Sequence, residues 1–135
     1  MNLIVCLDDK DGMSFFGRRQ SMDRALRERA LALAGEAGLW MDAYSAGQFS
    51  KEDRITVVSD FREETPPHAW YFLETGDIAE ALDRAEKVAV FRWNRLYPSD
   101  RRFPYETLCA PWRKTLEEEF PGHSHEKITL EVYEP

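Results

Sequence analysis

The segment Lys87-Val-Ala-Val-Phe-Arg-Trp-Asn94 decides the fold class of this sequence. Its apolar and β-branched residues predict a buried strand over residues 87–93. Asp77 and Glu80, just upstream, have the spacing of a capping box. They mark the start of a short helix that has an apolar stripe. Residues 69–73, before that helix, predict another strand. This succession of strand, helix and strand favours parallel strands in one sheet.

The N-terminal half supplies the centre of the predicted sheet. Residues 2–7 are almost all apolar, as expected of a strand that is covered on both faces. Ser21 is a suitable N-cap, and the apolar stripe behind it predicts a helix over residues 22–37 that ends at Gly38. Further short elements are predicted as a strand at 39–41, a one- or two-turn helix within 44–49 and a strand at 54–58.

The last third of the chain has a different pattern, because apolar and charged residues alternate. Trp112, Leu116 and Phe120 carry this alternation in one segment, and residues 128–132 carry it in the next. Two half-exposed strands joined through Pro121-Gly122 are therefore predicted to form an antiparallel hairpin at one edge. The sum is an α/β fold with a mixed, mainly parallel sheet of about seven strands and few helices. We expect a single domain over residues 1–135.

The composition limits the possible partners. The 18 basic and 25 acidic side chains give a net charge of −7, which opposes binding to the phosphates of nucleic acids. No apolar stretch approaches the roughly 18 residues of a membrane-spanning helix, and residues 1–7 lack the basic leader of a secretory signal. Cys6 and Cys109 are predicted to be buried thiols. We therefore expect a cytoplasmic protein with neither a nucleic-acid nor a membrane partner.

Several motifs, taken together, resemble the dihydrofolate reductase family. The following motifs resemble the C-terminal half of such a reductase: residues 87–94, Tyr97-Pro-Ser-Asp100, Phe103-Pro104, Trp112, Glu119-Phe120 and Ile128-Thr-Leu-Glu-Val-Tyr-Glu134. Residues 3–8 and 11–17 look like its first strand and mobile active-site loop, and residues 70–77 look like its glycine-bearing turn between a strand and a helix. The segment 54–69 is shorter than in that family. The resemblance implies a dihydrofolate reductase-like fold with a cleft for a small ligand.

The residues that would carry the reductase's proton transfer are replaced. The resemblance places Gln20-Ser21 where the family has Pro-Trp, and Leu26 where it has the buried acid that assists protonation of the pterin. Asp23 and Glu28 flank that position and are the candidate proton donors. The threonine that supports the acid in the family corresponds to Phe91. We therefore expect no ordinary reductase activity.

The cofactor side is altered as well. The family's consecutive glycines, whose amides meet the NADPH pyrophosphate, correspond to Glu74-Thr75-Gly76-Asp77, which keeps one glycine and adds two carboxylates. Asp42-Ala-Tyr-Ser45 replaces the residues that would hold the 2′-phosphate, so Ser45 and Ser59 are the remaining matches to phosphate contacts. We expect no cofactor. NADPH is expected only under the alternative function, a divergent NADPH-dependent reductase that uses Asp23 or Glu28.

The functional prediction is a binding protein for a small nucleotide-like or aromatic ligand held in the cleft. The predicted ligand-binding residues are Cys6, Arg18, Arg19, Tyr44, Ser45, Ser59, Thr75, Gly76 and Phe91. The 4 tryptophans of this short chain also suggest a homodimer.

Three further motifs have simpler explanations. Phe91-Arg-Trp-Asn-Arg95, together with Arg18, Arg19 and Arg101-Arg102, has the composition of a surface for an anionic ligand, but a strand with alternating core and solvent residues and arginines paired with acids explains it better. His123-Ser-His125-Glu126 is more typical of a hairpin tip than of a metal site, so we expect no metal. No base is evident in the sequence for Ser21, Ser45 or Cys6, so nucleophilic catalysis is not predicted.

Residues 91–100 and 122–129 also resemble short bacterial proteins that carry a ribonuclease Z label. That label implies a zinc-dependent hydrolase with a His-x-His-x-Asp-His cluster. The sequence has 3 histidines, none in that arrangement, so we do not adopt this function.

Overall fold

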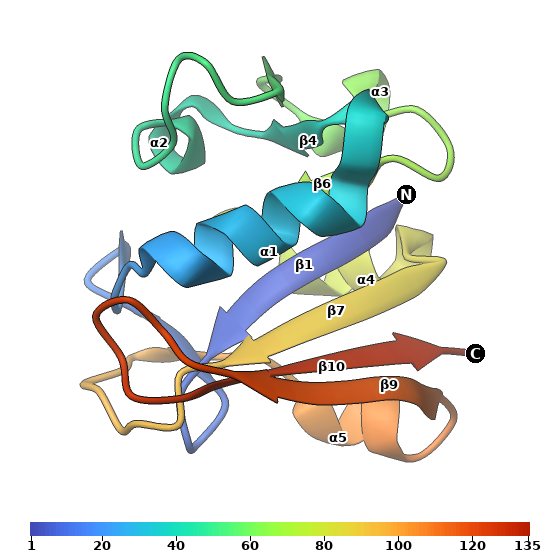
Figure 1. Ribbon diagram of the computed structural model, residues 1–135. Helices are drawn as coiled ribbons and strands as arrows, with labels where there is room; N and C mark the ends of the chain where they lie inside the picture. Colours follow the sequence, from blue (N-terminus) through green and yellow to red (C-terminus); the bar gives the residue numbers. More distant parts are fainter.

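The computed structural model describes residues 1–135, except for the side chains of Glu63 and Glu64. Its main feature is a 7-stranded sheet with the order β5-β4-β6-β1-β7-β10-β9 (Figure 1). The strands are β1 (Asn2–Leu7), β4 (Leu39–Met41), β5 (Ile55–Val57), β6 (Trp70–Phe72), β7 (Lys87–Arg92), β9 (Arg113–Phe120) and β10 (Ile128–Glu134). The pairs of β1 with β6 and β7, and of β4 with β5 and β6, are parallel, whereas β10 is antiparallel to β7 and β9. The predicted α/β fold with a C-terminal antiparallel hairpin is confirmed.

β1 is the central strand, as its apolar sequence predicts. Leu3, Val5 and Leu7 are fully buried in one hydrophobic cluster, and Ile4 is fully buried in another. Successive side chains of a strand point to opposite faces, so a strand that is covered on both sides must be apolar throughout. β1 therefore joins the two halves of the core.

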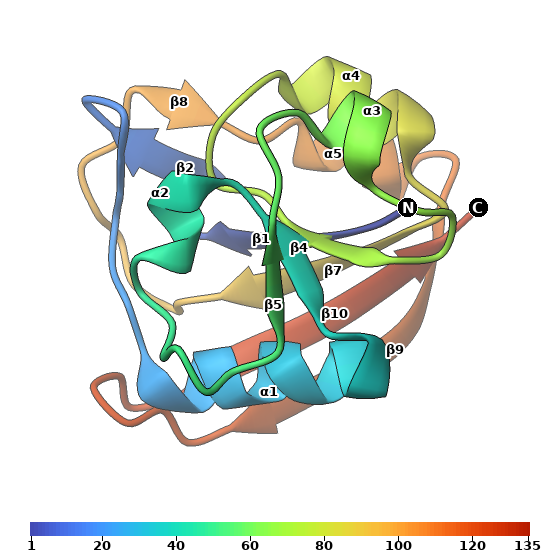
Figure 2. The ribbon, with the colours of Figure 1, turned by 90° about the horizontal axis from the view of Figure 1, so that it is seen from above.

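Helices cover both faces of the sheet. α1 (Arg24–Ala34) lies across one face, and α3 (Phe61–Glu64), α4 (Ile78–Arg84) and α5 (Tyr105–Cys109) lie on the other (Figure 2). Leu26 and Ala30 are the buried residues of α1, and they share a cluster with Ile4, Phe72 and Phe91. The short α2 (Ala43–Ala46) follows β4.

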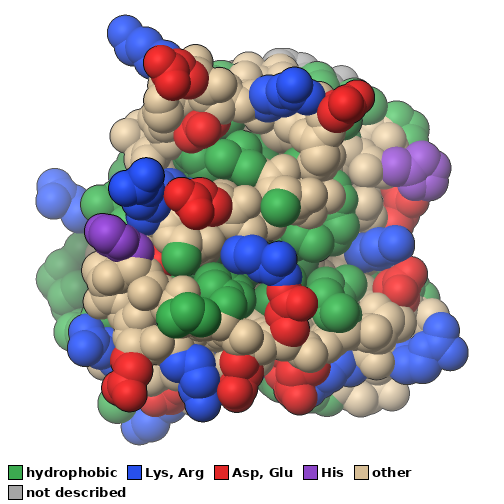
Figure 3. Space-filling model, viewed as in Figure 1, with side chains coloured by type: hydrophobic (Ala, Val, Ile, Leu, Met, Phe, Trp, Pro, Cys, Tyr) green, Lys and Arg blue, Asp and Glu red, His purple; other side chains and the backbone are tan. Residues whose placement is uncertain are grey.

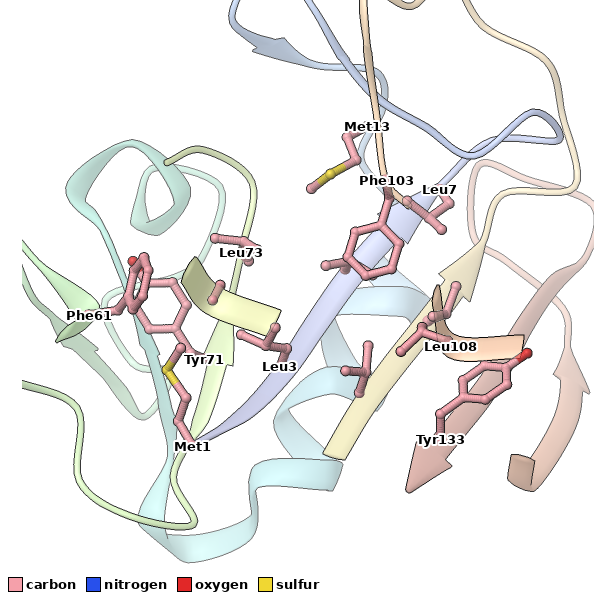
Figure 4. Close-up of a cluster of buried hydrophobic side chains, with 14 of the residues drawn as sticks. Met1, Leu3, Leu7, Met13, Phe61, Tyr71, Leu73, Phe103, Leu108 and Tyr133 are labelled. Carbon is pink, nitrogen blue, oxygen red and sulfur yellow. The ribbon is translucent and has the colours of Figure 1, made fainter. Parts of the chain in front are cut away.

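The cluster on the opposite face reaches the carboxyl end of β1. Leu3 and Leu7 of β1 share it with Tyr71 and Leu73, and the ring of Phe103 lies close to Leu7 (Figure 4). Phe103 comes from a segment almost 100 positions further along the chain, so its burial ties that segment to the end of β1. This packing fixes the loops that surround the site described below.

α1 begins later than the sequence predicts. Asp23, and not Ser21, is the N-cap, because its carboxylate accepts hydrogen bonds from the backbone N–H groups of Ala25 and Leu26. Asp and Ser cap helices about equally well, so other contacts of the folded protein decide between them. A 3-10 turn over Gly35–Ala37 ends the helical segment, with positive φ angles at Gly35 (64°) and Gly38 (79°).

A small 3-stranded sheet, which the sequence patterns do not predict, lies beside the main one. Its order is β3 (Arg18–Arg19), β2 (Gly12–Phe15) and β8 (Arg101–Arg102). Phe16-Gly17 forms the tight turn between β2 and β3, with φ angles of 50° and 71°. Two-residue hairpin turns need this left-handed backbone, but a bulky residue such as Phe16 rarely adopts it.

The two strands of the C-terminal hairpin differ in burial. β9 forms an edge of the sheet and is mainly exposed, whereas β10 lies between β7 and β9 and is mainly buried. The expectation of two half-exposed strands is therefore wrong for β10. Its second face is covered because Tyr105 of α5 packs edge-on against the Tyr133 ring and donates a hydrogen bond to Glu131.

One face of the molecule carries side chains of both charges. On the face seen in Figure 1, basic and acidic side chains are interspersed and gather in no large patch of one sign (Figure 3). Both cysteines are free, and Cys6 is half-buried. Cys109 is exposed at the end of α5, so the prediction that both thiols are buried is wrong for this residue. Within the part of the chain that the structure describes, no helix combines the length and apolar character needed to cross a membrane.

Candidate functional site

The carboxyl end of β1 is organised around Asp8, which is 1% exposed. Its Oδ1 accepts hydrogen bonds from the N–H groups of Lys10 and Gly12, each at 2.8 Å, and its Oδ2 accepts one from the Gln20 amide at 2.9 Å. Burial by itself would raise the pKa of Asp8, but these hydrogen bonds and one from the Tyr97 N–H outweigh it and lower the pKa. The ionised Asp8 therefore holds together the loops that follow β1, β3 and β7.

Arg19 is tied to two neighbouring segments. Its Nε donates to Glu74 Oε2 at 3.0 Å, and one of its terminal nitrogens donates to the Tyr44 carbonyl oxygen at 3.0 Å. Its guanidinium carbon also lies 4.3 Å from the centroid of the Tyr44 ring, in cation–π contact. Gln48 donates a further hydrogen bond to Glu74. The charge of Arg19 is therefore largely neutralised within the protein.

Two cavities meet at Arg19 and Gln20. The small cavity, of about 10 Å³, is lined by Cys6, Met13, Arg19, Gln20, Ser21, Leu73, Glu74 and Trp93. The aromatic hollow, of about 550 Å³, is lined by Phe15, Phe16, Arg18, Arg19, Gln20, Tyr97 and Pro98. Both lie beside the carboxyl ends of parallel strands, which is where open α/β sheets usually bind ligands. Of these two cavities, only the aromatic hollow has room for a small molecule without rearrangement.

The turn at the tip of β2 and β3 presents apolar rings to solvent. Phe16 is 77% exposed and Phe15 is 38% exposed, and their ring centroids are 4.1 Å apart. Arg18, on the next strand, is exposed, and its side chain forms no hydrogen bond or ion pair with any residue that the structure describes. The aromatic hollow therefore combines exposed rings with an unpaired positive charge.

A group of polar side chains, which we call the polar cluster, joins three distant segments. It consists of Ser21, Asp23, Tyr97 and His125. His125 Nδ1 lies 2.9 Å from Asp23 Oδ2, and His125 Nε2 lies 3.0 Å from Ser21 Oγ and 2.8 Å from the Tyr97 hydroxyl. Asp23 and His125 are only 2% and 6% exposed. The imidazole is thus held between a carboxylate on one side and two hydroxyls on the other.

Asp23 also anchors the loop that joins β9 to β10. It accepts hydrogen bonds from the backbone N–H groups of His123, Ser124 and His125 at 3.1, 2.9 and 3.1 Å. Burial alone would raise the pKa of Asp23, but the hydrogen bonds from the His123 N–H, the His125 ring and the Ser124 N–H outweigh it and hold the pKa well below its usual range. The carboxylate is therefore ionised, and its oxygens are occupied by groups of the protein.

The Cys6 thiol faces the small cavity in a protonated form. Burial is the main reason that its pKa is raised well above the usual value, and the negative charge of Glu74 raises it further, whereas Arg19 acts in the opposite sense. Because the thiolate is the nucleophilic form of cysteine, Cys6 is a weak nucleophile here.

A second hollow, of about 190 Å³, has an acidic lining. This acidic hollow is lined by Asp42, Ser59, Asp60, Phe61, Arg62, Tyr71, Thr75, Gly76 and Asp77. The Thr75 hydroxyl donates a hydrogen bond to Asp42, and Gly76 has a left-handed φ of 94°. Three carboxylates at one hollow oppose the binding of a pyrophosphate.

The predicted ligand-binding residues are divided among these places. Arg18 and Arg19 line the aromatic hollow, Cys6 and Arg19 line the small cavity, and Tyr44 stacks on Arg19. Ser59, Thr75 and Gly76 line the acidic hollow.

Two of the predicted ligand-binding residues lie in the interior instead. Phe91 is fully buried and packs edge-on against Phe120. Ser45 is also fully buried, and its hydroxyl has no hydrogen-bond partner among the described residues. Neither residue lines the aromatic hollow, the small cavity or the acidic hollow.

The two candidate proton donors are separated from the aromatic hollow and the small cavity. Asp23 lies within the polar cluster, where its oxygens are already hydrogen-bonded. The Glu28 side chain is 67% exposed on α1 and pairs with Arg24 at 3.3 Å. Proton donation by either residue stays a prediction. Neither side chain lines the aromatic hollow or the small cavity.

His125 and Tyr97 are site residues that the sequence did not indicate. His125 lies 102 positions from Asp23 and 28 from Tyr97, so no local motif links them. The available signal was the segment His123-Ser-His125 after Pro121-Gly122, and its more usual meaning is a turn. Within the described residues, no group of three or more His, Cys, Asp or Glu is arranged to hold a metal ion.

In comparisons with known proteins, no family model and no curated protein sequence matches this chain.

Proposed function

We propose that this protein binds a small anionic ligand with an aromatic ring, such as a nucleotide, in the aromatic hollow, and that it lacks ordinary dihydrofolate reductase activity. The observation that carries the proposal is Arg18. It is an exposed guanidinium in a hollow that also contains two exposed phenylalanine rings, and no described residue neutralises its charge.

The chemistry of this lining fits such a ligand. A guanidinium binds phosphate or carboxylate through paired, charge-assisted hydrogen bonds, and aromatic rings stack on one another. Exposed apolar side chains grouped at a concave surface are typical of binding sites. The left-handed backbone of Phe16 costs on the order of 1 kcal/mol, and strain of this kind recurs at functional sites.

The dihydrofolate reductase-like scaffold is part of the same proposal. The sequence motifs are its basis, and three features of the fold support it. These features are the central N-terminal strand, the mainly parallel sheet and the antiparallel hairpin formed by β9 and β10. A shared scaffold does not imply a shared activity, so the residues of the hollow, and not the fold, determine the ligand.

Calorimetry and thermal unfolding with AMP test the proposal directly. Binding at a ligand concentration 100 times the dissociation constant raises the free energy of unfolding by ~2.7 kcal/mol. This stabilisation is observed as a clear increase in melting temperature. Arg18→Gln is expected to lose most of this increase. Arg113→Gln, which removes an exposed arginine from β9, is the matched control and is expected to keep it. Equal binding by both variants would contradict the role of Arg18.

A divergent NADPH-dependent reductase is the second candidate function. It is favoured by Gly76, whose left-handed backbone just before α4 keeps one glycine of a phosphate-binding turn. It is opposed by the carboxylates of Asp42, Asp60 and Asp77 in the same hollow. Titration with NADPH, followed by nicotinamide fluorescence, separates the two functions. A fluorescence change that Arg18→Gln leaves intact would favour the reductase.

The expected partners follow from the same proposal. We propose a small-molecule ligand, and neither a nucleic acid nor a membrane. A homodimer stays a prediction, and sedimentation velocity of the purified protein measures it.

A further inference from the structure

We propose that Ser21, His125 and Asp23 form a nucleophile, base and orienting acid that transfer a small acyl group from an ester to water. The basis for this hydrolase activity is the polar cluster together with the two cavities that meet beside Ser21. It does not depend on the ligand proposed for the aromatic hollow.

The distances fix the proton positions in the resting state. Asp23 is ionised and accepts hydrogen bonds only, so His125 Nδ1, 2.9 Å from its Oδ2, carries the hydrogen. In the neutral imidazole, Nε2 is then the acceptor, and Ser21 Oγ lies 3.0 Å from it. These are the contacts by which a histidine removes the proton of a serine hydroxyl.

The imidazole is held rigidly in this orientation. Trp93 stacks on the His125 ring, with centroids 4.6 Å apart and an angle of 28° between the planes. The backbone N–H of His125 is also bound to Asp23, so one carboxylate fixes both the loop and the ring. A base that is fixed in this way needs little reorganisation when it takes up a proton.

The cavities and backbone N–H groups beside Ser21 indicate which kind of ester would bind there. Ser21 is half-buried and lines the small cavity, which shares Arg19 and Gln20 with the aromatic hollow. The small cavity does not hold an acyl group as it stands, so acylation of Ser21 requires Gln20 or another lining side chain to move, while the aromatic leaving group would lie in the aromatic hollow. The backbone N–H groups of Ser21 and Met22 donate to no acceptor among the described residues. Free main-chain donors beside the nucleophile are what an oxyanion requires.

Tyr97 competes with the serine for the base. Its hydroxyl lies 2.8 Å from the same Nε2, and one lone pair accepts only one strong hydrogen bond. Tyr97 also lines the aromatic hollow. A substrate that takes over the hydrogen bond of Tyr97 leaves Nε2 to Ser21, so occupation of the hollow favours the reactive pair.

The proposed reaction balances without a cofactor. Ser21 Oγ bonds to the carbonyl carbon, its proton passes to His125 Nε2, and the bond from the carbonyl carbon to the leaving oxygen breaks as that oxygen takes the proton. Water then attacks the acyl carbon as its proton passes to His125 Nε2, the bond from that carbon to Ser21 Oγ breaks as Oγ takes this proton, and the free acid leaves. p-Nitrophenyl acetate is a suitable ester substrate for this reaction, and its products are acetate and p-nitrophenol.

The test follows p-nitrophenol release and maps the acetylated peptide by mass spectrometry after an acid quench. We expect acetyl on Ser21, none at residue 21 in Ser21→Ala, and acetylation about 100-fold slower in His125→Gln. Ser50→Ala, which removes an exposed serine of a distant loop, is the matched control and is expected to keep the wild-type rate. Circular dichroism of each variant establishes that it is folded.

Two results would overturn the proposal. One is acetylation confined to residues other than Ser21. The other is an unchanged rate of Ser21 acetylation in folded His125→Gln. If His125→Gln does not fold, the pH dependence of Ser21 acetylation in the wild-type protein tests the proposal, because an imidazole base loses its activity when protonated. A fall of at least about tenfold in Ser21 acetylation between pH 8 and pH 5 supports the proposal, and a rate independent of pH contradicts it.

Discussion

Gly122 lies directly against Asp23, and a Cβ atom at residue 122 would come within 2.8 Å of Asp23 Oδ2. The same atom would lie 2.5 Å from the carbonyl oxygen of His125. The loop between β9 and β10 can therefore reach the carboxylate that caps α1 only because residue 122 has no side chain.

Gly122→Ala is expected to lower the free energy of unfolding by about 1–3 kcal/mol, the usual cost of overpacking a closely packed site. Urea unfolding followed by circular dichroism measures it. Gly47→Ala is the control, because its Cβ would meet only the Tyr44 carbonyl oxygen, at 3.3 Å. We expect a change below about 1 kcal/mol there. A Gly122→Ala protein as stable as the wild type would show that the loop does not pack on Asp23.

Asp23→Asn is expected to destabilise the protein by about 2 kcal/mol at neutral pH, because buried backbone donors lose a charged acceptor. The folded pKa of Asp23 lies below its unfolded value, so its stabilisation is present above the unfolded pKa of about 3.9. That stabilisation is lost as the pH falls from this value toward the folded pKa.

The stability difference between wild type and Asp23→Asn should therefore narrow in acid, and urea unfolding at pH 7 and pH 3 measures the change. Glu28→Gln, which alters an exposed carboxylate paired with Arg24, serves as the control. Its effect is expected to stay below about 0.5 kcal/mol. A difference for Asp23→Asn that is equally large at both pH values would be inconsistent with the lowered pKa.

Glu74→Gln is expected to make the Cys6 thiol about tenfold more reactive toward Ellman's reagent, through both charge and access. The substitution removes a negative charge that raises the pKa of Cys6, and it weakens the contact that holds Arg19 beside the small cavity. Measurements in a Cys109→Ser background report Cys6 alone. Glu52→Gln, at an exposed site, should leave the rate unchanged. If Glu74→Gln also leaves it unchanged, burial alone controls this thiol.

Phe16→Asn is expected to raise the free energy of unfolding by about 1 kcal/mol, because Asn tolerates the left-handed backbone and Asn-Gly is a favoured hairpin turn. The same change should weaken binding of the anionic fluorophore 8-anilinonaphthalene-1-sulfonate, since it removes an exposed ring from the aromatic hollow. Thermal unfolding and fluorescence titration measure the two effects.

Gly17→Ala provides the opposite control for that turn. A Cβ at residue 17 meets no atom within 4 Å, so the left-handed φ of 71° is the source of its expected loss of about 1 kcal/mol. Tighter fluorophore binding by Phe16→Asn would contradict a role for Phe16 in the hollow.

The fold could be predicted where each residue pattern has one meaning. Residues 2–7 are almost all apolar and residues 88–91 are apolar throughout, and buried parallel strands require that composition. The alternation in residues 113–120 predicted an edge strand for a similar reason. Burial of β10 was missed because it depends on Tyr105, which comes from a different segment.

The candidate site could be predicted only in part. Arg18 and Arg19 were predicted to line the cleft of a dihydrofolate reductase-like protein, and both line the aromatic hollow. His125 was not indicated, because its role depends on a loop that folds back onto residues more than 100 positions earlier. Such a contact has no sequence period. It arises from the packing of β10 beside β7, which brings that loop to the N-terminus of α1.

The internal position of β10 has a consequence for synthesis on the ribosome. A nascent chain that has emerged only as far as residue 127 leaves the β7 edge, with Val88, Val90 and Phe91, without its neighbour. Unpaired edges with apolar side chains attract other chains, so this intermediate is a natural substrate for chaperones. Pairing of β10 completes the sheet and brings the loop that carries His125 to Asp23.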